Sequence, residues 1–118
     1  MGLVYIVQEV VRRGSGGALQ RVHDLTPAAV YGDLIPLLET DKLPLTPAPI
    51  VHELKRKLKD FCDDDHLLAV GDPIAIGIAT AIAAEVNHGR VSMLKWDREA
   101  RQYIRVVFDL RNHARKGE

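Results

Sequence analysis

The chain has 118 residues, of which 47% are hydrophobic and 27% charged, as is usual for one soluble globular domain with its own core. Sixteen acidic residues balance sixteen basic ones, so no global field favours nucleic acid or an anionic membrane. The single cysteine, Cys62, excludes an internal disulfide and favours a reducing compartment. The N-terminus lacks the basic and apolar regions of a secretion signal, so we expect a cytoplasmic protein.

The start of the chain predicts a hairpin. Residues 3–11 are rich in β-branched and aromatic residues, which favours a strand, and residues 18–25 predict a second strand that pairs with the first. The loop between them, RRGSGG, lacks the lysine and the Ser/Thr of a phosphate-binding loop. We interpret it as a mobile hairpin tip at which Arg12 and Arg13 can contact an acidic partner.

A short helix and an edge strand are predicted next. Thr26 and Pro27 favour the cap and first turn of a helix that stops at Gly32. Residues 33–39 are apolar enough for a strand. Pro36 cannot donate to a ladder, which favours an edge position or an irregular segment.

A buried strand followed by an apolar helix is the clearest prediction. Residues 66–70 hold the continuous apolar run of a strand that is covered on both faces. Gly71 suits a tight turn, Asp72 suits an N-cap, and Pro73–Val86 predicts a helix that is apolar on nearly every side. We expect this helix to be the most buried one and to pack on the strand, so that Gly77→Leu overpacks the contact.

The fold class follows from the order of the elements. A stiff loop over 40–49 and a helix over 50–61 precede the buried strand, and strands over 90–97 and 102–110 follow the apolar helix. Strands joined by helices run parallel, whereas strands joined by hairpins run antiparallel. We therefore predict one α/β domain of all 118 residues. It has a mixed sheet of about five or six strands, parallel in its centre, with two main helices and one short helix. Residues 111–118 are predicted to be a frayed basic tail.

Two aspartates are predicted at the edge of the sheet where ligands usually bind. If the strands ending near Val70 and Trp96 are parallel, Asp72 and Asp97 emerge from the same edge, beside Lys95 and Trp96. Two carboxylates there could hold a divalent metal, or share acid and base roles in an enzyme acting on a nucleotide or phosphoester. Alternatively, Asp72 caps a helix and Asp97 opens a turn, and we favour these structural roles.

Other charged residues form an acidic loop and a basic helix face. The acidic loop consists of Asp63, Asp64 and Asp65. The basic helix face consists of Lys55, Arg56, Lys57 and Lys59. Cys62 and His66 flank the acidic loop, but the spacing matches neither a closed zinc site nor an EF-hand, and we predict no metal and no cofactor. We expect a partner to meet this end of the domain. Replacing the three aspartates by lysine should slow association and leave the fold intact.

One part of the chain carries a resemblance. The stretch LLAVGDPIAIGIATAIAAEVNHGRVSMLKWDREARQYIRV, about a third of the sequence, resembles small uncharacterised accessory proteins of tailed bacteriophages, as do VYIVQE and DLTPAAVYGDL nearer the start. The GDP turn and the LKWDR segment carry most of the likeness. The resemblance implies an accessory role in the host cytoplasm, of a kind often performed by binding host machinery. It assigns no catalytic or binding residue.

No serine, cysteine or histidine has neighbours in the pattern of a nucleophilic site. We therefore expect a non-catalytic interaction protein, a phage-type accessory factor that binds a host or phage protein, with a homo-oligomer as a further option and no membrane partner. The alternative is an auxiliary nucleic-acid-binding protein that uses the basic helix face and the tail. The third hypothesis is the enzyme with Asp72 and Asp97.

Overall fold

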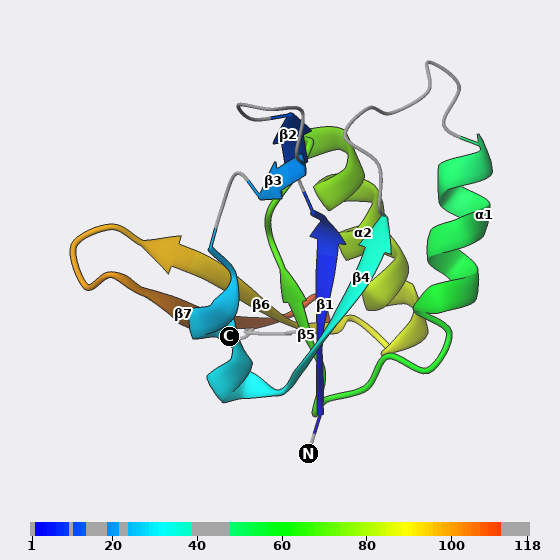
Figure 1. The fold of residues 1–118 in the computed structure, drawn as a ribbon. Coiled ribbons are helices and arrows are strands. Elements are labelled where there is room, and N and C mark those ends of the chain that lie inside the picture. The colour runs from blue at the N-terminus through cyan, green and yellow to red at the C-terminus, as the bar shows by residue number, and fades with distance from the viewer. Residues whose placement is uncertain (1, 10, 14–18, 22–23, 39–47, 112–118) are drawn as a thin grey trace.

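The computed structural model describes residues 2–9, 11–13, 19–21, 24–38 and 48–111. Its main feature is a five-stranded sheet with the strand order β4-β1-β5-β6-β7. The strands are β1 (Leu3–Gln8), β4 (Asp33–Leu38), β5 (His66–Leu68), β6 (Arg90–Asp97) and β7 (Gln102–Asp109). All neighbouring pairs are parallel except β6 and β7, which form an antiparallel hairpin. The predicted α/β class with a mixed sheet is thereby confirmed (Figure 1).

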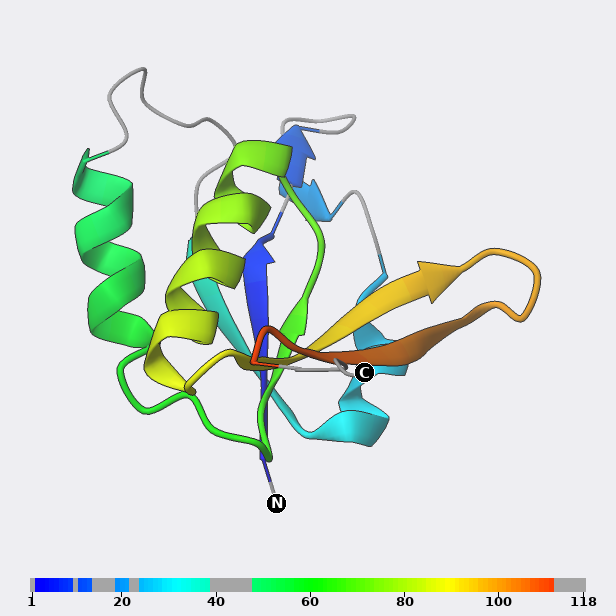
Figure 2. The same cartoon turned by 180° about the vertical axis from the view of Figure 1, so that it is seen from behind.

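Helices cover both faces of this sheet. In the described part of the chain they are the 3-10 helix η2 (Thr26–Tyr31) and the α-helices α1 (Ala48–Lys57) and α2 (Pro73–Val86). α1 and α2 lie on one face, as the view from behind shows clearly (Figure 2), and η2 lies against the other. We call these the helix face and the η2 face.

β1 supplies both cores because successive side chains of a strand point to opposite faces. Tyr5 and Val7 belong to the core on the helix face, and Val4 and Ile6 belong to the core on the η2 face. Every residue from Val4 to Gln8 is buried. β1 is therefore a central strand and not the outer strand of a hairpin.

This placement corrects the predicted N-terminal hairpin. β1 pairs with β4 and β5, and not with residues 18–25. The hairpin is a separate ribbon of β2 (Val11–Arg13) and β3 (Leu19–Arg21), so Arg12 and Arg13 lie in a strand; residues 14–18 lie outside the described residues. The pattern of β1 is apolar on both faces, which suits a parallel central strand better than a half-solvated hairpin.

Other predicted elements agree with the structure in type, but two differ in their bounds and one in its cap. The helix predicted over 50–61 is α1, which ends at Lys57, so Lys59 lies in the turn that follows it. The strand predicted over 66–70 is β5, which ends at Leu68. α2 and β6 have the predicted bounds, and β4, which contains Pro36, is an edge strand. Gly32 ends η2 as predicted, but Thr26 is not the cap. The N-cap is Leu25, which makes no side-chain cap hydrogen bond, while Asp24 accepts a hydrogen bond from the N–H of Thr26. Most of the loop over 40–49 and of the basic tail lies outside the described residues.

α2 is the most buried helix in the described part of the chain, but one side of it is open. Ala75, Ala79 and Ala83 are fully buried, and their small side chains let α2 lie close to β1 and β6, the strands on either side of β5. Ile74 is 65% exposed, and a Cβ placed on Gly77 would meet nothing within 4 Å. The predicted overpacking by Gly77→Leu is therefore wrong, because Gly77 faces away from the sheet.

Gly71 is the glycine that the fold depends on most directly. Its φ is +113°, and a Cβ there would lie 2.4 Å from Cβ of Gln8. We expect Gly71→Ala to lower the free energy of unfolding by about 2 kcal/mol or more. Gly77→Ala is the matched control, since its Cβ enters open space on a helix and should raise stability by up to about 1 kcal/mol. Urea denaturation measures both, and effects of the same sign would contradict the prediction.

Candidate functional site

Asp72 and Asp97 have the structural roles that the sequence favours. Asp72 Oδ1 accepts a hydrogen bond from the N–H of Ile74 at 2.8 Å and caps α2. Asp97 Oδ1 accepts from the N–H groups of Glu99 and Ala100, at 3.0 and 3.3 Å, and closes the turn between β6 and β7. Each carboxylate thus accepts hydrogen bonds from backbone N–H groups close to it in sequence. This geometry gives no support to a metal or acid–base site shared by the two residues.

Gln8 fills the place where an α/β sheet usually binds its ligand. β1 and β5 are neighbours whose connections leave on opposite faces, so a crevice is expected between their carboxyl ends. Gln8 is 2% exposed there: its N–H donates to the carbonyl of Val70 at 3.2 Å, and its Oε1 accepts from the N–H of Asp72 at 2.7 Å. The carboxylate of Asp72 also disfavours an anion at the start of α2.

A pocket of about 590 Å³ opens one strand further along the same edge. The carboxyl ends of β5 and β6, the start of β7 and the segment around the start of η2 form its walls. The side chains that carry its chemistry are those of Asp24, Pro27, Trp96, Arg98 and Tyr103. Trp96 is 43% exposed, and its ring lies edge-on to the buried ring of Tyr103 at a centroid distance of 5.0 Å. Of the predicted ligand edge, Trp96 lines this pocket, whereas Asp72, Lys95 and Asp97 do not.

Asp65 is a structural member of the acidic loop. It is 6% exposed, and its Oδ1 accepts from the N–H of Leu3 at 2.9 Å while Oδ2 accepts from the N–H of Cys62 at 3.1 Å. The carboxylate thus fastens the loop before β5 to the start of β1. The prediction that lysine at all three acidic-loop positions leaves the fold intact is therefore wrong for Asp65.

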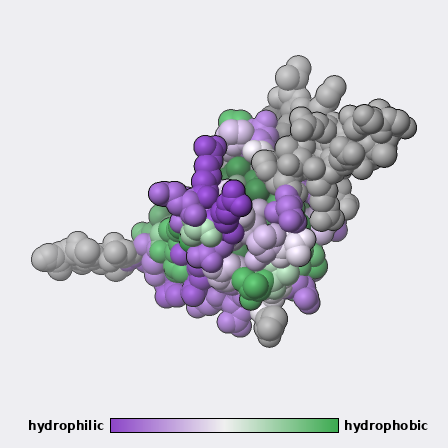
Figure 3. Space-filling model, turned by 60° about the vertical axis from the view of Figure 1, so that its left-hand side comes forward, coloured by the Kyte–Doolittle hydropathy of each residue, from purple (hydrophilic) through white to green (hydrophobic). Residues whose placement is uncertain are grey.

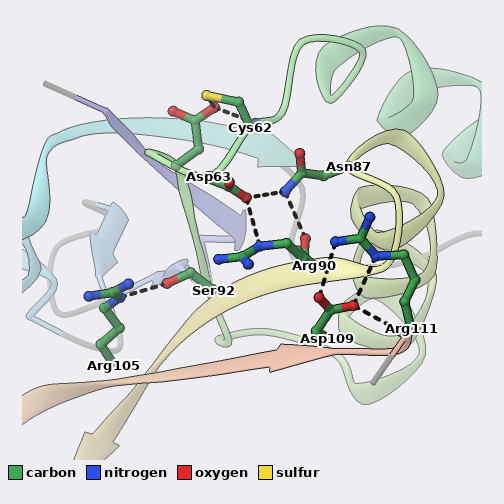
Figure 4. A network of polar contacts seen from close by, with 9 residues as sticks. Cys62, Asp63, Asn87, Arg90, Ser92, Arg105, Asp109 and Arg111 are labelled. Atoms are coloured by element: carbon green, nitrogen blue, oxygen red, sulfur yellow. Dashed lines mark hydrogen bonds and ion pairs between the residues drawn. The ribbon is translucent and has the colours of Figure 1, made fainter. Parts of the chain in front are cut away.

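The other two aspartates of the acidic loop lie at the surface. Asp63 Oδ1 accepts from Asn87 at 2.8 Å and from Arg90 at 3.1 Å (Figure 4). The hydrogen bond from Asn87, and then the charge of Arg90, lower the pKa of Asp63. Asp64 is exposed. A role of the acidic loop in binding a partner stays a prediction, and Asp63 and Asp64 are its exposed members.

A polar row crosses the η2 face, with His66 and Ser92 buried and Arg105 exposed, and sequence reasoning missed it. His66 Nδ1 lies 2.6 Å from Ser92 Oγ, and Arg105 Nε donates to the same oxygen at 3.3 Å. The ring of Tyr31 lies edge-on to the ring of His66 at 5.6 Å. Burial, and then the positive charge of Arg105, lower the pKa of His66. The row joins β5, β6 and β7, so only the strand register brings its members together, and no local spacing could have revealed it.

One member of the basic helix face, Lys57, makes contacts within the domain, and the others are exposed. Its exposed members are Lys55, Arg56 and Lys59. Lys57 Nζ instead donates to the carbonyl of Leu37 at 2.6 Å and pairs with Glu53 at 2.9 Å. The side chains of Arg12 and Arg13 lie outside what the structure describes.

Two findings concern the described residues as a whole. No group of three or more His, Cys, Asp or Glu side chains among them is arranged to hold a metal ion. No helix in this part of the chain is long and apolar enough to cross a membrane.

A comparison with known protein families matches residues 2–110 to one family, which therefore covers the pocket, the acidic loop and all strands of the sheet. The chain belongs to the family of phage Pam3 gp32-like proteins. The resemblance to small proteins of tailed bacteriophages is thereby confirmed. Neither a comparison with curated proteins nor one with solved structures gives a match.

The contacts of Asp65 predict an asymmetry within the acidic loop. Asp65→Ala leaves the N–H groups of Leu3 and Cys62 without their carboxylate, which should lower the free energy of unfolding by about 2 kcal/mol or more. Asp64→Ala removes an exposed side chain and should change the free energy of unfolding by less than about 0.5 kcal/mol. Chemical denaturation of both variants tests this, and equal losses would show that Asp65 has no special role.

The environment of His66 predicts a pH dependence of stability. Its folded pKa lies below the ordinary 6.5, so the unfolded chain binds the proton more readily. The contribution of neutral His66 to the free energy of unfolding is therefore fully present above about pH 6.5. It is lost as the pH falls from there toward the pKa of His66 in the folded chain. We expect the free energy of unfolding to fall between pH 7.5 and 5.5, and this slope to be smaller in His66→Gln. His52→Gln, at an exposed position, should keep the wild-type slope.

Proposed function

We propose that the protein is a phage accessory protein that acts by binding another protein, of the host or of the phage, in the host cytoplasm. The observation that carries this proposal is the pocket beside Trp96. Membership of the phage family supports the accessory role. The composition of the pocket supports a protein as the partner.

The pocket has the composition of a protein-binding hot spot. Tryptophan, tyrosine and arginine are the residues that most often dominate the energy of protein interfaces. Trp96 is held edge-on by Tyr103, so its exposed ring costs little conformational entropy to order on binding. An apolar side chain of the partner could enter the pocket against Trp96 and Pro27, and the exposed Arg98 could bind a carboxylate of the partner.

The surrounding surface agrees with a localised contact. On the face shown in Figure 3, hydrophobic residues form separate areas between hydrophilic ones. Large exposed apolar side chains in the described part of the chain include Trp96 and Val30, but only Trp96 lines the pocket. Val30, which is 80% exposed on η2, therefore offers a control position.

Trp96→Ala should weaken partner binding. We expect its loss to weaken the complex at least about tenfold, with at least about 1.4 kcal/mol less binding energy, because it removes the anchor of the pocket. The tagged protein is first used to capture partners from phage-infected cells. Calorimetry then measures the affinity of the identified partner for the wild type, for Trp96→Ala and for Val30→Ala. Circular dichroism confirms that each variant is folded.

The outcomes separate the alternatives. Wild-type affinity in Trp96→Ala would exclude the pocket as the contact. Capture that disappears after nuclease treatment, and that is lost on replacing Lys55, Arg56 and Lys59 by alanine, would overturn the proposal in favour of nucleic-acid binding through the basic helix face. Capture that survives nuclease and depends on Trp96 supports a protein partner.

A further inference from the structure

β7 forms one outer edge of the sheet, and its second half is open to solvent. Val106 and Val107 are 44% and 45% exposed, and Leu110, directly after the strand, is 70% exposed. Among the strands that the structure describes, β7 pairs only with β6. An exposed edge strand with apolar side chains is a template for a further strand.

The backbone of β7 shows which residues face the outer edge. The N–H of Leu110 donates to the carbonyl of Gly89 at 2.8 Å, in continuation of the β6–β7 register. Backbone groups of successive residues alternate in direction in an antiparallel pair, so those of even-numbered residues point to β6. The residues whose N–H and carbonyl groups point outward are Tyr103, Arg105, Val107 and Asp109.

One contact agrees with this assignment and limits the open edge. The carbonyl of Tyr103 accepts a hydrogen bond from the hydroxyl of Tyr31 at 2.9 Å, from outside the β6–β7 ladder. η2 therefore closes the edge at Tyr103. The open part begins at Arg105.

The side chains of β7 form two rows, because successive residues point to opposite faces. The row on the helix face is apolar and consists of Ile104, Val106 and Phe108, continued by Leu110. The row on the η2 face reads Arg105, Val107 and Asp109, which is a base, an apolar residue and an acid. When two copies of this second row run antiparallel, Arg105 of each copy can lie opposite Asp109 of the other.

We propose that the protein forms a homodimer in which the β7 strands of two copies pair antiparallel, with Val107 opposite Val107 of the second copy. In this register each Arg105 lies opposite Asp109 of the other copy, and each Val106 lies opposite Phe108. The pair of Val107 with Val107 of the second copy, and each pair of Arg105 with Asp109, are hydrogen-bonded pairs. In each pair the two residues exchange two backbone hydrogen bonds. The contact is isologous and closed, which is the commonest form of homo-oligomer.

The charges select this register over its neighbours. A shift by one pair in one direction places Arg105 opposite Arg111, and like charges directly opposite destabilise a sheet. The shift in the other direction places Arg105 opposite Val107 and Asp109 opposite Tyr103. The register centred on Val107 is the one that pairs opposite charges on both sides of the two-fold axis.

Both charged side chains are held in place before association. Arg105 Nε donates to Ser92, and Asp109 accepts from Arg111 Nε and Nη2 at 3.2 and 3.1 Å (Figure 4). The hydrogen bonds from Arg111 lower the pKa of Asp109, so its carboxylate is charged at neutral pH. Ordering these side chains therefore costs little when the dimer forms.

The opposite edge of the sheet does not offer an equivalent contact. β4 contains Pro36, which has no N–H to donate. Lys57 also donates to the carbonyl of Leu37 on the same strand. β7 is thus the edge that fits a second copy of this chain.

Sedimentation equilibrium tests the dimer itself. The wild type should change from monomer to dimer with concentration. Val107→Lys, which sets two lysines side by side at the axis, should weaken the dimer at least about tenfold. Val30→Lys is the control and should dimerise as wild type does. A wild type that stays monomeric up to about 1 mM, or a dimer that Val107→Lys leaves unchanged, overturns the proposal.

A charge exchange tests the pairing of Arg105 with Asp109. Arg105→Asp alone sets two acids opposite each other, and Asp109→Arg alone sets two arginines opposite each other, so each variant should be monomeric. Mixed together, the two variants restore both opposite-charge pairs and should form a heterodimer. Circular dichroism confirms that each variant is folded. A mixture that does not associate overturns the pairing.

Cysteine cross-linking tests the register in a Cys62→Ser background, which removes the exposed native thiol. Val107→Cys should give a covalent dimer under mild oxidation, because residue 107 faces its own copy across the axis. Val106→Cys is the matched control and should not. Cross-linking of Val106→Cys in place of Val107→Cys, or of neither, would overturn this register.

Discussion

The hydrogen bond from the N–H of Asp72 to Oε1 of Gln8 joins the end of β1 to the start of α2. This junction links a strand that supplies both cores to the helix that packs on the centre of the sheet, where α2 contacts β1 and β6. Gly71 makes the junction close enough, since its left-handed backbone leaves no room for a Cβ against Gln8. Apolar burial supplies most of the stability, but this polar contact decides how the layers meet.

The same junction determines where the domain can bind anything. Gln8 occupies the usual crevice between β1 and β5, and the carboxylate of Asp72 stands at the N-terminus of α2, where a phosphate would otherwise be favoured. The concave surface is displaced to the ends of β5 and β6, where Trp96 and Tyr103 supply aromatic rings and Arg98 a positive charge. Such a pocket suits the side chains of another protein better than the phosphates of a nucleotide.

The sequence predicted the elements whose signals are local, and it could not predict those that depend on distant residues. The bounds of α2 and β6, the cap at Asp72, the turn at Asp97 and the edge position of Pro36 all follow from neighbours within a few residues. Asp65 is different, because its partner Leu3 lies 62 positions away and nothing in an acidic run marks one member as buried.

Misplaced elements have the same cause. Adjacent strands usually pair, which predicts a hairpin for β1, whereas its actual partners β4 and β5 follow later in the chain. The pairing of His66 with Ser92 and the pocket at Trp96 likewise require the strand order. The orientation of Gly77 could not be read from a helix that is apolar on all sides, because such a pattern does not say which side meets the sheet.

The β6–β7 hairpin carries both proposed contacts, and they do not compete for the same residues. Trp96 and Tyr103 line the pocket at the turn end of the hairpin, while the open edge begins at Arg105 and runs toward the other end. In the proposed dimer, no pocket residue belongs to the strand pairs at the interface, so one pocket per copy would be carried on a single continuous sheet. If the partner offers two sites at a matching distance, the second contact becomes intramolecular, and the complex tightens without any change in the pocket. A small accessory protein can then bind an oligomeric target firmly through one modest pocket per chain.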